Sequence, residues 1–388
     1  MSDTRNLLRT QQFPAVLLLL AAALGLLLAN LPSHGPIAAI LDAHIAIPGT
    51  GIDLSVAHWI SDGLLAIFFF VVAMELQYEL TRGELNSFRK AVQPAIAAAG
   101  GVLVPIAIYL MLAGDGATAS GWPIPTATDI AFALGVLAVF GKGLPAAVRV
   151  FLLALAILDD IIGIIFIAVL FAHDLNWVFL VLAVVGVVAF GAISRMLPTK
   201  NSRLVITVMI ILGVVVWALV LLSGIHATIA GVMLGLAIAQ SPSMQARHAI
   251  EPWVNGAILP IFAFAAAFVV IPAVAPADLS PAFFGIAVAL PVGKIIGITV
   301  FGWIAVRIGS GSKSSALTVM DLVAAGALGG IGFTVSLLLA NLAFADDPGV
   351  RDQAILGVLV GSLISVVLAG VLVSSRAAWH RRVNAASS

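Results

Sequence analysis

Two adjacent aspartates, Asp159 and Asp160, lie in the middle of an apolar stretch that runs from Ala147 to Phe171. A stretch of about 25 residues is long enough to cross a bilayer as a helix. A carboxylate at the bilayer centre costs roughly 2.5–3.5 kcal/mol to insert, and two neighbouring carboxylates also repel each other. No stability argument favours such a pair. Binding a cation, carrying protons, or both would explain it.

Two further charged residues, Asp129 and Lys294, also lie within apolar stretches. Asp129 ends a helix-breaking sequence that contains Pro123, Pro125 and Thr128, so it could neutralise the positive N-terminal ends of broken helices. Lys294 could neutralise the negative C-terminal ends, or it could pair with an aspartate. For both residues the alternative is purely structural compensation of charge.

Other polar residues lie nearer the ends of apolar stretches. Asp62 could line an outward-facing funnel or simply cap a helix. Glu75 and Glu79 lie one helical turn apart and share a face, which is either a solvated surface or an antenna for protons and cations. His226 is either a hydrogen-bonded packing residue or a ligand. No spacing of His and Asp residues resembles a zinc site.

The composition around these residues is that of an integral membrane protein. Hydrophobic residues make up 62% of the 388 residues and charged residues only 9%. A soluble chain of this length would carry about 25% charged residues. The net charge of zero implies no nucleic-acid partner, and the absence of cysteine excludes disulfides and thiolate chemistry.

Hydropathy predicts an all-α protein with about twelve membrane-spanning helices. Nearly all Lys and Arg residues fall on one side of the membrane in this scheme, which places both termini in the cytoplasm. The predicted spans are Phe13–Leu31, His58–Leu80, Pro94–Leu112, Gly121–Phe140, Ala147–Phe171, Trp177–Ser194, Leu204–Leu222, Ile225–Ala239, Pro252–Ile271, Pro281–Val306, Asp321–Phe344 and Gln353–Ser374.

The fourth and eleventh predicted spans carry helix-breaking sequence, at Pro123–Asp129 and at the glycine-rich segment Gly326–Thr334. Broken backbone at membrane depth is tolerated where it lines a cavity. The breaks lie about 200 residues apart, and interrupted helices in matching positions point to a transporter site. We therefore expect residues 94–171 and 281–374 to form inverted repeats with two discontinuous, crossing helices, within one transporter domain of residues 1–388.

A β-hairpin is predicted at residues 44–56, in the first outer loop. Ile45 and Ile47 alternate with other residues before Pro48-Gly49-Thr50-Gly51, and a second alternating segment follows. An isolated hairpin is marginally stable. Its open edges could pair with a second copy in a homodimer, or the hairpin could lie on the chain's own loops.

Several longer motifs together resemble the bacterial NhaA-type Na+/H+ antiporter family, over nearly the whole chain. They are Ala127–Gly135, Leu155–Asp160, Gly224–Gly231, Leu259–Ala265, Gly293-Lys294 and Gly330–Ser336. The resemblance implies that Asp160 is the principal cation ligand and that Asp159 is its partner and the proton carrier, with Lys294 close by. Asp129 and Thr128 would belong to the assembly of crossed helices.

The resemblance also implies roles at the two membrane surfaces, in a periplasmic funnel or in the response to pH, for Asp62, Glu75, Glu79, His226, His248 and Glu251. The chain departs from the family there. Gln77 and Tyr78 stand where basic residues are common, and Arg247 and Glu251 stand where an acid and a histidine are usual.

The implied function is secondary active antiport in the bacterial cytoplasmic membrane, in which cytoplasmic Na+ or Li+ is exchanged for external H+. Such exchange would be electrogenic, would serve pH and sodium homeostasis, and would need no cofactor. The expected partners are the transported ions, membrane lipid and a second copy of the chain. Alternatives are a Na+-coupled organic anion symporter of similar broken-helix architecture, an intramembrane aspartyl protease, and a channel.

Overall fold

A computed structural model describes residues 12–32, 34–83, 86, 88–171, 175–197, 202–271, 279–308 and 317–387, almost entirely as helices. The chain divides into two compact units. The first is built mainly from Leu31–Gly83 and Ile164–Ala265, and the second from Thr10–Asn30, Glu84–Gly163 and Ala266–Ser388.

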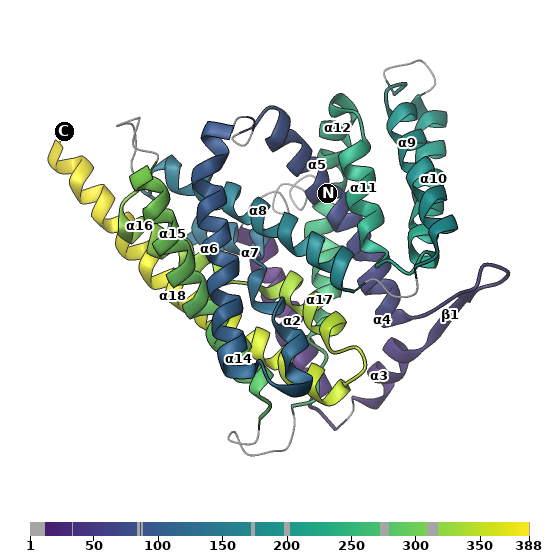
Figure 1. The fold of residues 1–388 in the computed structure, drawn as a ribbon, viewed down its shortest axis with the longest axis horizontal. Coiled ribbons are helices and arrows are strands. Elements are labelled where there is room, and N and C mark those ends of the chain that lie inside the picture. The colour runs from purple at the N-terminus through teal and green to yellow at the C-terminus, as the bar shows by residue number, and fades with distance from the viewer. Residues whose placement is uncertain are drawn as a thin grey trace. The chain divides into compact units, whose positions relative to one another are not determined.

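The first unit is a set of helices with one small sheet. Its helices α9 (Trp177–Ser194) and α10 (Ser202–Leu222) lie side by side (Figure 1). The other helical elements are α3 (Gly35–Asp42), α4 (Val56–His58), the π-helical turn η1 (Trp59–Leu64), α5 (Leu65–Thr81), α11 (Thr228–Ala237), α12 (Gln240–Trp253), the π-helical turn η4 (Val254–Ile258) and α13 (Leu259–Ala266), whose last residue belongs to the second unit.

The sheet of the first unit is the predicted hairpin. Strands β1 (His44–Ile47) and β2 (Ile52–Ser55) pair antiparallel, with Ile47 opposite Ile52. Gly49 and Gly51 adopt φ angles of 78° and 74°, a region that glycine enters without the steric cost of a Cβ. The alternation of apolar residues around a Pro-Gly turn thus predicts this hairpin correctly.

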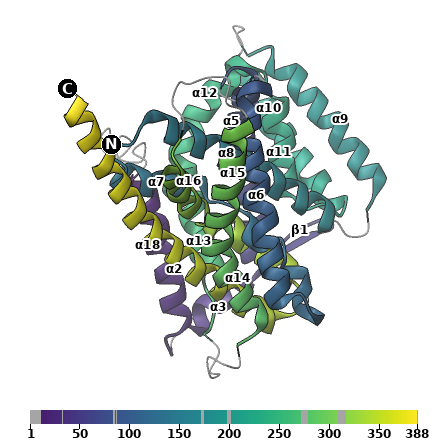
Figure 2. The same ribbon diagram turned by 60° about the vertical axis from the view of Figure 1, so that its left-hand side comes forward.

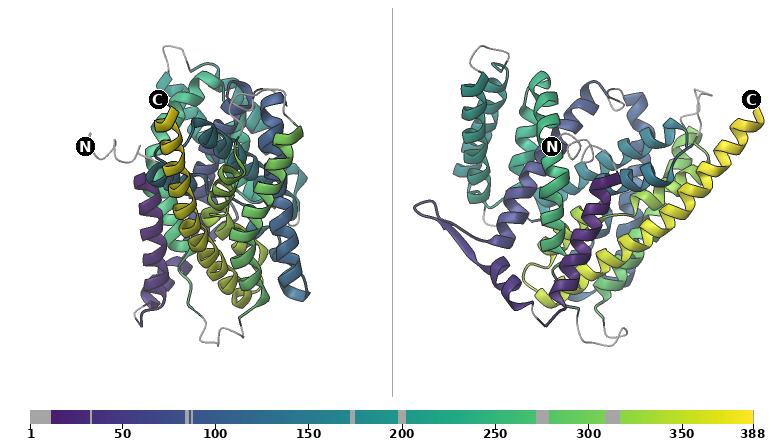
Figure 3. Two further views of the ribbon diagram at one scale, coloured as in Figure 1. Left: turned by 90° about the vertical axis from the view of Figure 1, so that its left-hand side faces the viewer. Right: turned by 180° about the vertical axis from the view of Figure 1, so that it is seen from behind.

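The second unit contains both helix-breaking segments. Its helices α6 (Phe88–Ala113) and α15 (Lys294–Ile308) lie against each other (Figure 2). The remaining elements are α2 (Gln12–Ala29), the 3₁₀ turns η2 (Gly116–Gly121) and η3 (Ile124–Thr126), α7 (Ile130–Phe140), α8 (Ala146–Leu170), whose residues from Ile164 belong to the first unit, α14 (Pro281–Val288), the π-helical turn η6 (Ala289–Gly293), α16 (Val319–Gly329), α17 (Phe333–Ala343) and α18 (Pro348–Ser387). Figure 3 shows α18 running as one long helix to the C-terminus.

Glycines allow α6 and α15 to approach closely. A Cβ added at Gly100 would lie 2.4 Å from the carbonyl oxygen of Gly297, and one added at Gly297 would lie 2.1 Å from the carbonyl oxygen of Gly100. Both distances are impossible for a real side chain. Small residues at helix contacts in membranes let backbones pack at van der Waals distance in this way.

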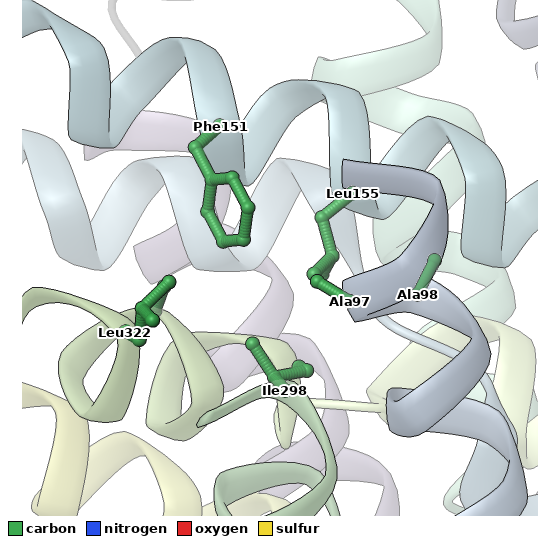
Figure 4. Close-up of a cluster of buried hydrophobic side chains, with 7 residues drawn as sticks. Ala97, Ala98, Phe151, Leu155, Ile298 and Leu322 are labelled. Atoms are coloured by element: carbon green, nitrogen blue, oxygen red, sulfur yellow. The ribbon is translucent and has the colours of Figure 1, made fainter. Parts of the chain in front are cut away.

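A small apolar core joins four helices of the second unit (Figure 4). Leu322 of α16 and Ile298 of α15 pack in it with side chains of α6 and α8, the helix that carries Asp159. The full set is Ala97, Ala98, Phe151, Leu155, Ile298, Leu322 and Ala325. This core packs α16 and α8 in one apolar cluster.

The predicted membrane-spanning character is confirmed, whereas the number of spans stays a prediction. Among the described residues, 8 helices are long and apolar enough to cross a membrane, or 9 if the bent pair α16 and α17 counts as one span. Two shorter apolar helices, Phe13–Ala29 and Thr228–Ala237, correspond to the first and eighth predicted spans. The fourth predicted span is divided into η3, a non-helical segment and α7.

Candidate cation site

The two helix-breaking segments meet inside the second unit. Ala127 to Asp129 are non-helical between η3 and α7, and α16 and α17 bend by 50° where Gly330 to Gly332 separate them. The amide of Asp129 donates to the carbonyl of Ile331 at 2.6 Å. The Thr128 hydroxyl lies 2.7 Å from the carbonyl oxygen of Gly329, the last residue of α16. Each break therefore satisfies backbone groups that the other leaves free, as burial in a membrane requires.

Asp129 caps two helices at once. Its Oδ1 accepts from the Phe132 amide at 2.9 Å, in the first turn of α7. Its Oδ2 accepts from the Thr334 amide at 3.2 Å and from the Thr334 hydroxyl at 2.8 Å, in the first turn of α17. A carboxylate is favourable at both N-termini because it satisfies free N–H groups and opposes the positive ends of the helix dipoles.

Lys294 and Asp159 form a fully buried ion pair beside the meeting point. Nζ of Lys294 lies 2.6 Å from Oδ2 of Asp159, and both side chains are 0% exposed. Nζ also donates to the carbonyl of Thr126 at 2.5 Å and to Oγ1 of Thr128 at 3.1 Å. These three contacts use all three ammonium donors, which is how a buried lysine offsets its lost hydration.

The oxygens of Asp159 do not all have a hydrogen-bond donor. Oγ1 of Thr128 lies 2.8 Å from Oδ2 of Asp159 and 2.7 Å from Gly329 O, but a hydroxyl has only one proton to give. Oδ1 of Asp159 is buried and makes no hydrogen bond to any described residue. The site thus combines an open carboxylate oxygen with nearby hydroxyl and backbone carbonyl oxygens. Unwound backbone carbonyls and the C-terminal ends of half-helices coordinate Na+ in broken-helix transporters.

Asp160 follows Asp159 in α8, but its side chain lies outside the described part of the structure. Its predicted role as the principal cation ligand therefore stays a prediction. The structure does bring together four of the other predicted residues, namely Asp159, Lys294, Thr128 and Asp129.

Asp62 and His226 form a second pair, within the first unit. Nε2 of His226 lies 3.2 Å from Oδ1 of Asp62, which also accepts from the Ser61 hydroxyl at 3.0 Å. Nδ1 of the same ring lies 2.9 Å from the Thr228 hydroxyl. The indole of Trp217 donates to the backbone carbonyl of Asp62 at 2.8 Å. A neutral imidazole with its proton on Nε2 meets both of its partners here.

Glu75 pairs with Arg247, which connects α5 to α12. The Arg247 guanidinium lies 2.9 Å from Oε1 of Glu75, and both side chains are 22% exposed. Gln77 donates to the carbonyls of Leu236 and Ile238, each at 2.7 Å. Arg247 and Gln77, two residues at which the chain departs from the NhaA pattern, thus connect α5 to α12 and to the C-terminal end of α11. Of the other predicted residues at this end, Glu79 is buried, Glu251 is half-buried and His248 is exposed.

Comparisons with known proteins decide the family. A family described as Na+/H+ antiporter 1 matches residues 5–373. The chain belongs to this family. The Na(+)/H(+) antiporter NhaA 2 of Clavibacter michiganensis subsp. michiganensis is 52% identical over 98% of this chain and 94% of its own length. The Na(+)/H(+) antiporter NhaA of Tropheryma whipplei (strain Twist) is 45% identical over 95% and 94%, and that of Yersinia enterocolitica is 40% identical over 94% and 94%.

Membership of the Na+/H+ antiporter 1 family confirms the resemblance. The protein is a multi-pass membrane transporter that exchanges Na+ and H+, and it is not an enzyme. The ions are its cargo, and the antiporter needs no cofactor. The alternatives of an aspartyl protease, an anion symporter and a channel do not fit this family.

Sequence reasoning about the antiporter missed several charged and polar partners. Thr334 is the second partner of Asp129, and Arg247 is the partner of Glu75. A third case is Asp321 of α16, which binds Arg376 and His380 of α18. One signal was available for Asp321, because Thr318-Val319-Met320-Asp321 follows the Thr-x-x-acid pattern of a capping box, and the structure forms that box.

Proposed function

We propose that the antiporter binds Na+ or Li+ in competition with protons at Asp159 and Asp160. The observation that carries this proposal is the open Oδ1 of Asp159, which is buried where the two broken helices meet and makes no hydrogen bond to any described residue. The other oxygen of the same carboxylate, Oδ2, is paired with Lys294. Na+ arriving at the carboxylates competes with the ammonium of Lys294 and with protons for the same negative charge. Protonation in turn ejects Na+, because a low-dielectric site does not hold excess positive charge.

The exchange we propose is electrogenic. Two adjacent carboxylates serve one monovalent cation, so more than one proton can move inward for each Na+ that leaves the cytoplasm. The membrane potential then contributes about 2.3 kcal/mol per net charge and per 100 mV. This drive would let external protons expel cytoplasmic Na+ and so support pH and sodium homeostasis.

The residues around the carboxylates have supporting roles in this proposal. Lys294 offsets the carboxylate charge while no Na+ is bound, Thr128 links the pair to the end of α16, and Asp129 holds α7 and α17 together. At the surfaces, Asp62 and His226 belong to an outer funnel. The cytoplasmic response to pH is assigned to Glu75, Glu79, His248 and Glu251.

We also propose twelve spans in the bacterial cytoplasmic membrane, with both termini in the cytoplasm and with residues 94–171 and 281–374 as inverted repeats. Two contacts support the repeats. Gly100 and Gly297, in the first helix of each repeat, lie so close that neither has room for a Cβ, and the breaks in the middle helices are joined by the hydrogen bond from Asp129 to Ile331. A two-fold relation between the repeats would bring corresponding helices together in this way, with the fourth and eleventh spans crossing.

A homodimer through the hairpin completes the proposal. All four residues of β1 are exposed, including Ile45 and Ile47, so its outer edge is available to a second copy. Deleting residues Pro48 to Ile52 should therefore weaken dimerisation while exchange continues. Native mass spectrometry in mild detergent measures this, and an unchanged fraction of dimer would rule out the hairpin as the main contact.

The experiment that tests the exchange uses purified protein in proteoliposomes with an imposed pH gradient. Na+, Li+ or K+ is added at values from about pH 6 to pH 9, and the dissipation of the gradient is followed by a fluorescent dye. We expect Na+ and Li+, but not K+, to dissipate the gradient. A potential-sensitive dye should report charge movement in the same vesicles, and its silence would contradict electrogenic exchange.

A further inference from the structure

A second buried charged cluster lies at the opposite end of α16 from the candidate cation site. The Asp321 side chain is 2% exposed. Its Oδ1 accepts from Nε of Arg376 and lies against Nε2 of His380, both at 3.0 Å. Its Oδ2 accepts from the Thr318 amide at 3.0 Å and from the Thr318 hydroxyl at 2.8 Å. Each carboxylate oxygen therefore has two partners, which fills its capacity to accept.

The α18 side of this cluster is held rigidly. The guanidinium of Arg376 lies 4.2 Å from the ring centre of Trp379, and it also donates to Oγ1 of Thr318 at 2.9 Å. The rings of Trp379 and His380 pack edge to face with centroids 4.7 Å apart. These residues are three and four positions from Arg376, so they share one face of α18. An arginine stacked on an aromatic ring and bound at two points keeps a fixed orientation.

The next residue of α18 holds another part of the second unit. Arg381 donates to the carbonyl of Lys142, in the loop between α7 and α8. Adjoining turns of α18 therefore contact both the start of α16 and the loop that joins the two helices carrying Asp129 and Asp159. We name residues 376–381 the C-terminal clamp.

The helix α16 connects this clamp to the cation site. Its 11 residues span about 16 Å at 1.5 Å per residue, and its last carbonyl, that of Gly329, faces the Thr128 hydroxyl. Close packing along α16 makes its position sensitive to any shift at its start. A Cβ at Gly326 would lie 2.8 Å from the Cα of Ile295, and one at Gly329 would lie 2.7 Å from Ile298. A shift at Asp321 is therefore passed to the Gly329 carbonyl rather than absorbed on the way.

We propose that the C-terminal clamp positions α16 for cation binding, with Asp321 and Arg376 as positioning residues. The inference rests on the proposed cation site at Asp159. Releasing the clamp moves the Gly329 carbonyl relative to Thr128 and so changes how the single hydroxyl proton of Thr128 is divided between that carbonyl and Asp159. Asp159 then leaves its binding geometry. A misplacement of about 1 Å is enough to weaken a preorganised site severalfold.

The test compares Arg376→Gln and Asp321→Asn with wild type and with Arg382→Gln, which changes an exposed arginine on the same helix. Exchange is measured in proteoliposomes against Na+ concentration at fixed pH, and the Tm of each protein is measured in detergent. We expect KM for Na+ to rise about 3- to 10-fold in the first two variants while the maximal rate stays within about 2-fold. Arg376→Lys, which keeps the charge, should recover part of the affinity, and Arg382→Gln should match wild type.

A purely stabilising cluster would give a different result. Tm and the amount of active protein would fall while KM for Na+ stayed at the wild-type value, and that outcome would overturn the clamp. Because Arg376 lies near the end of α18, Arg376→Gln keeps the test valid even if Asp321→Asn fails to fold. Asp159→Asn, run in parallel, separates the two proposals. Exchange by Asp159→Asn with normal affinity defeats the cation site, whereas its loss together with an unchanged KM in Arg376→Gln defeats only the clamp.

Discussion

Asp159 and Asp321 are both buried aspartates of the second unit. Asp159 pairs with Lys294 of another helix, and Asp321 pairs with Arg376 and His380 of another helix. Their oxygens differ. Both oxygens of Asp321 have two partners each, whereas Oδ1 of Asp159 makes no hydrogen bond to any described residue. Leaving a buried polar oxygen unpaired costs about 1–3 kcal/mol. Burial and a salt bridge are common to both aspartates, so the open oxygen is the feature that distinguishes the proposed cation site from the closed contact.

The basic partners of the two aspartates differ in how firmly they are held. Arg376 binds through two nitrogens and stacks on Trp379, so its planar group is fixed in place. Lys294 is a compact charge at the end of a flexible four-carbon stem. Asp159 is one of three partners of this ammonium, which can therefore leave the carboxylate when a cation arrives and keep Thr126 and Thr128. The guanidinium of Arg376 cannot leave Asp321 without also losing its stacking on Trp379 or its contact with Thr318. The Lys294 pair suits exchange, and the Arg376 pair suits permanent attachment.

The largest effect should come from removing a carboxylate at the open site. We expect Asp159→Asn and Asp160→Asn each to lower Na+-dependent proton movement about 100-fold or more, because an amide neither releases a proton nor offers a full negative charge. Folding should be retained, as judged by Tm and gel filtration in detergent. The control is Asp346→Asn at an exposed position. Substantial exchange by a well-folded Asp160→Asn protein would refute its assignment as the principal ligand.

Lys294→Gln should have the next largest effect. Without the ammonium, the negative charge of the aspartates is less compensated, so protons compete better with Na+ for the carboxylates. Apparent Na+ affinity at fixed pH should fall, and the activity profile should move to higher pH. Exchange is recorded across pH together with Tm. A lowered Tm with an unshifted profile would show instead that Lys294 only stabilises the fold.

The sequence predicts the open site better than the closed one. A charge in the middle of an apolar stretch is conspicuous, so Asp159, Asp129 and Lys294 can be singled out without a structure. The Gly-rich and Pro-rich breaks also predict where the backbone leaves helical geometry. These signals are local, because the cost of burying a charge or breaking a helix in a membrane applies to each segment by itself.

The sequence does not predict the ion pairs that Asp321 and Glu75 form with distant arginines, because neither member of such a pair is unusual at its own position in the sequence. Arg376 and His380 resemble the basic residues that usually follow a last span, and Asp321 resembles a helix cap at a membrane surface. Arg247 and Glu75 are 172 positions apart, and Asp321 and Arg376 are 55 apart. Only tertiary packing shows that these charges are buried together. Pairing between distant helices depends on how each helix is rotated about its axis and shifted along it, and hydropathy specifies neither.

Asp129→Asn should have a smaller effect on exchange than either change above. The amide keeps one oxygen for the Phe132 amide but presents N–H groups to the Thr334 amide, where the carboxylate accepted. We expect a loss of about 1–3 kcal/mol of stability and a partial loss of exchange. Thermal unfolding in detergent measures the first. Asn176→Ala removes an ordinary cap at α9 and is the matched control, since it should lower Tm without affecting exchange.

The smallest effect is expected at the Asp62–His226 pair of the first unit. Oδ1 of Asp62 has two side-chain partners, and both nitrogens of His226 are engaged, so the pair resembles the closed site at Asp321. A glutamine at position 226 can still donate to Asp62. We therefore expect His226→Gln to keep exchange within about 3-fold of wild type, with the same pH profile, because a neutral imidazole already meets both contacts.

Asp62→Ala sharpens this last test, because it leaves Nε2 of His226 without its acceptor and removes a charge from the proposed funnel. If the pair is only structural, Tm should fall while KM for Na+ and the pH profile stay unchanged. A profile that moves in both Asp62→Ala and His226→Gln would mean that protons pass through this pair during exchange. In that case a fully hydrogen-bonded carboxylate would be functional, and the contrast between open and closed oxygens would no longer identify the transport site by itself.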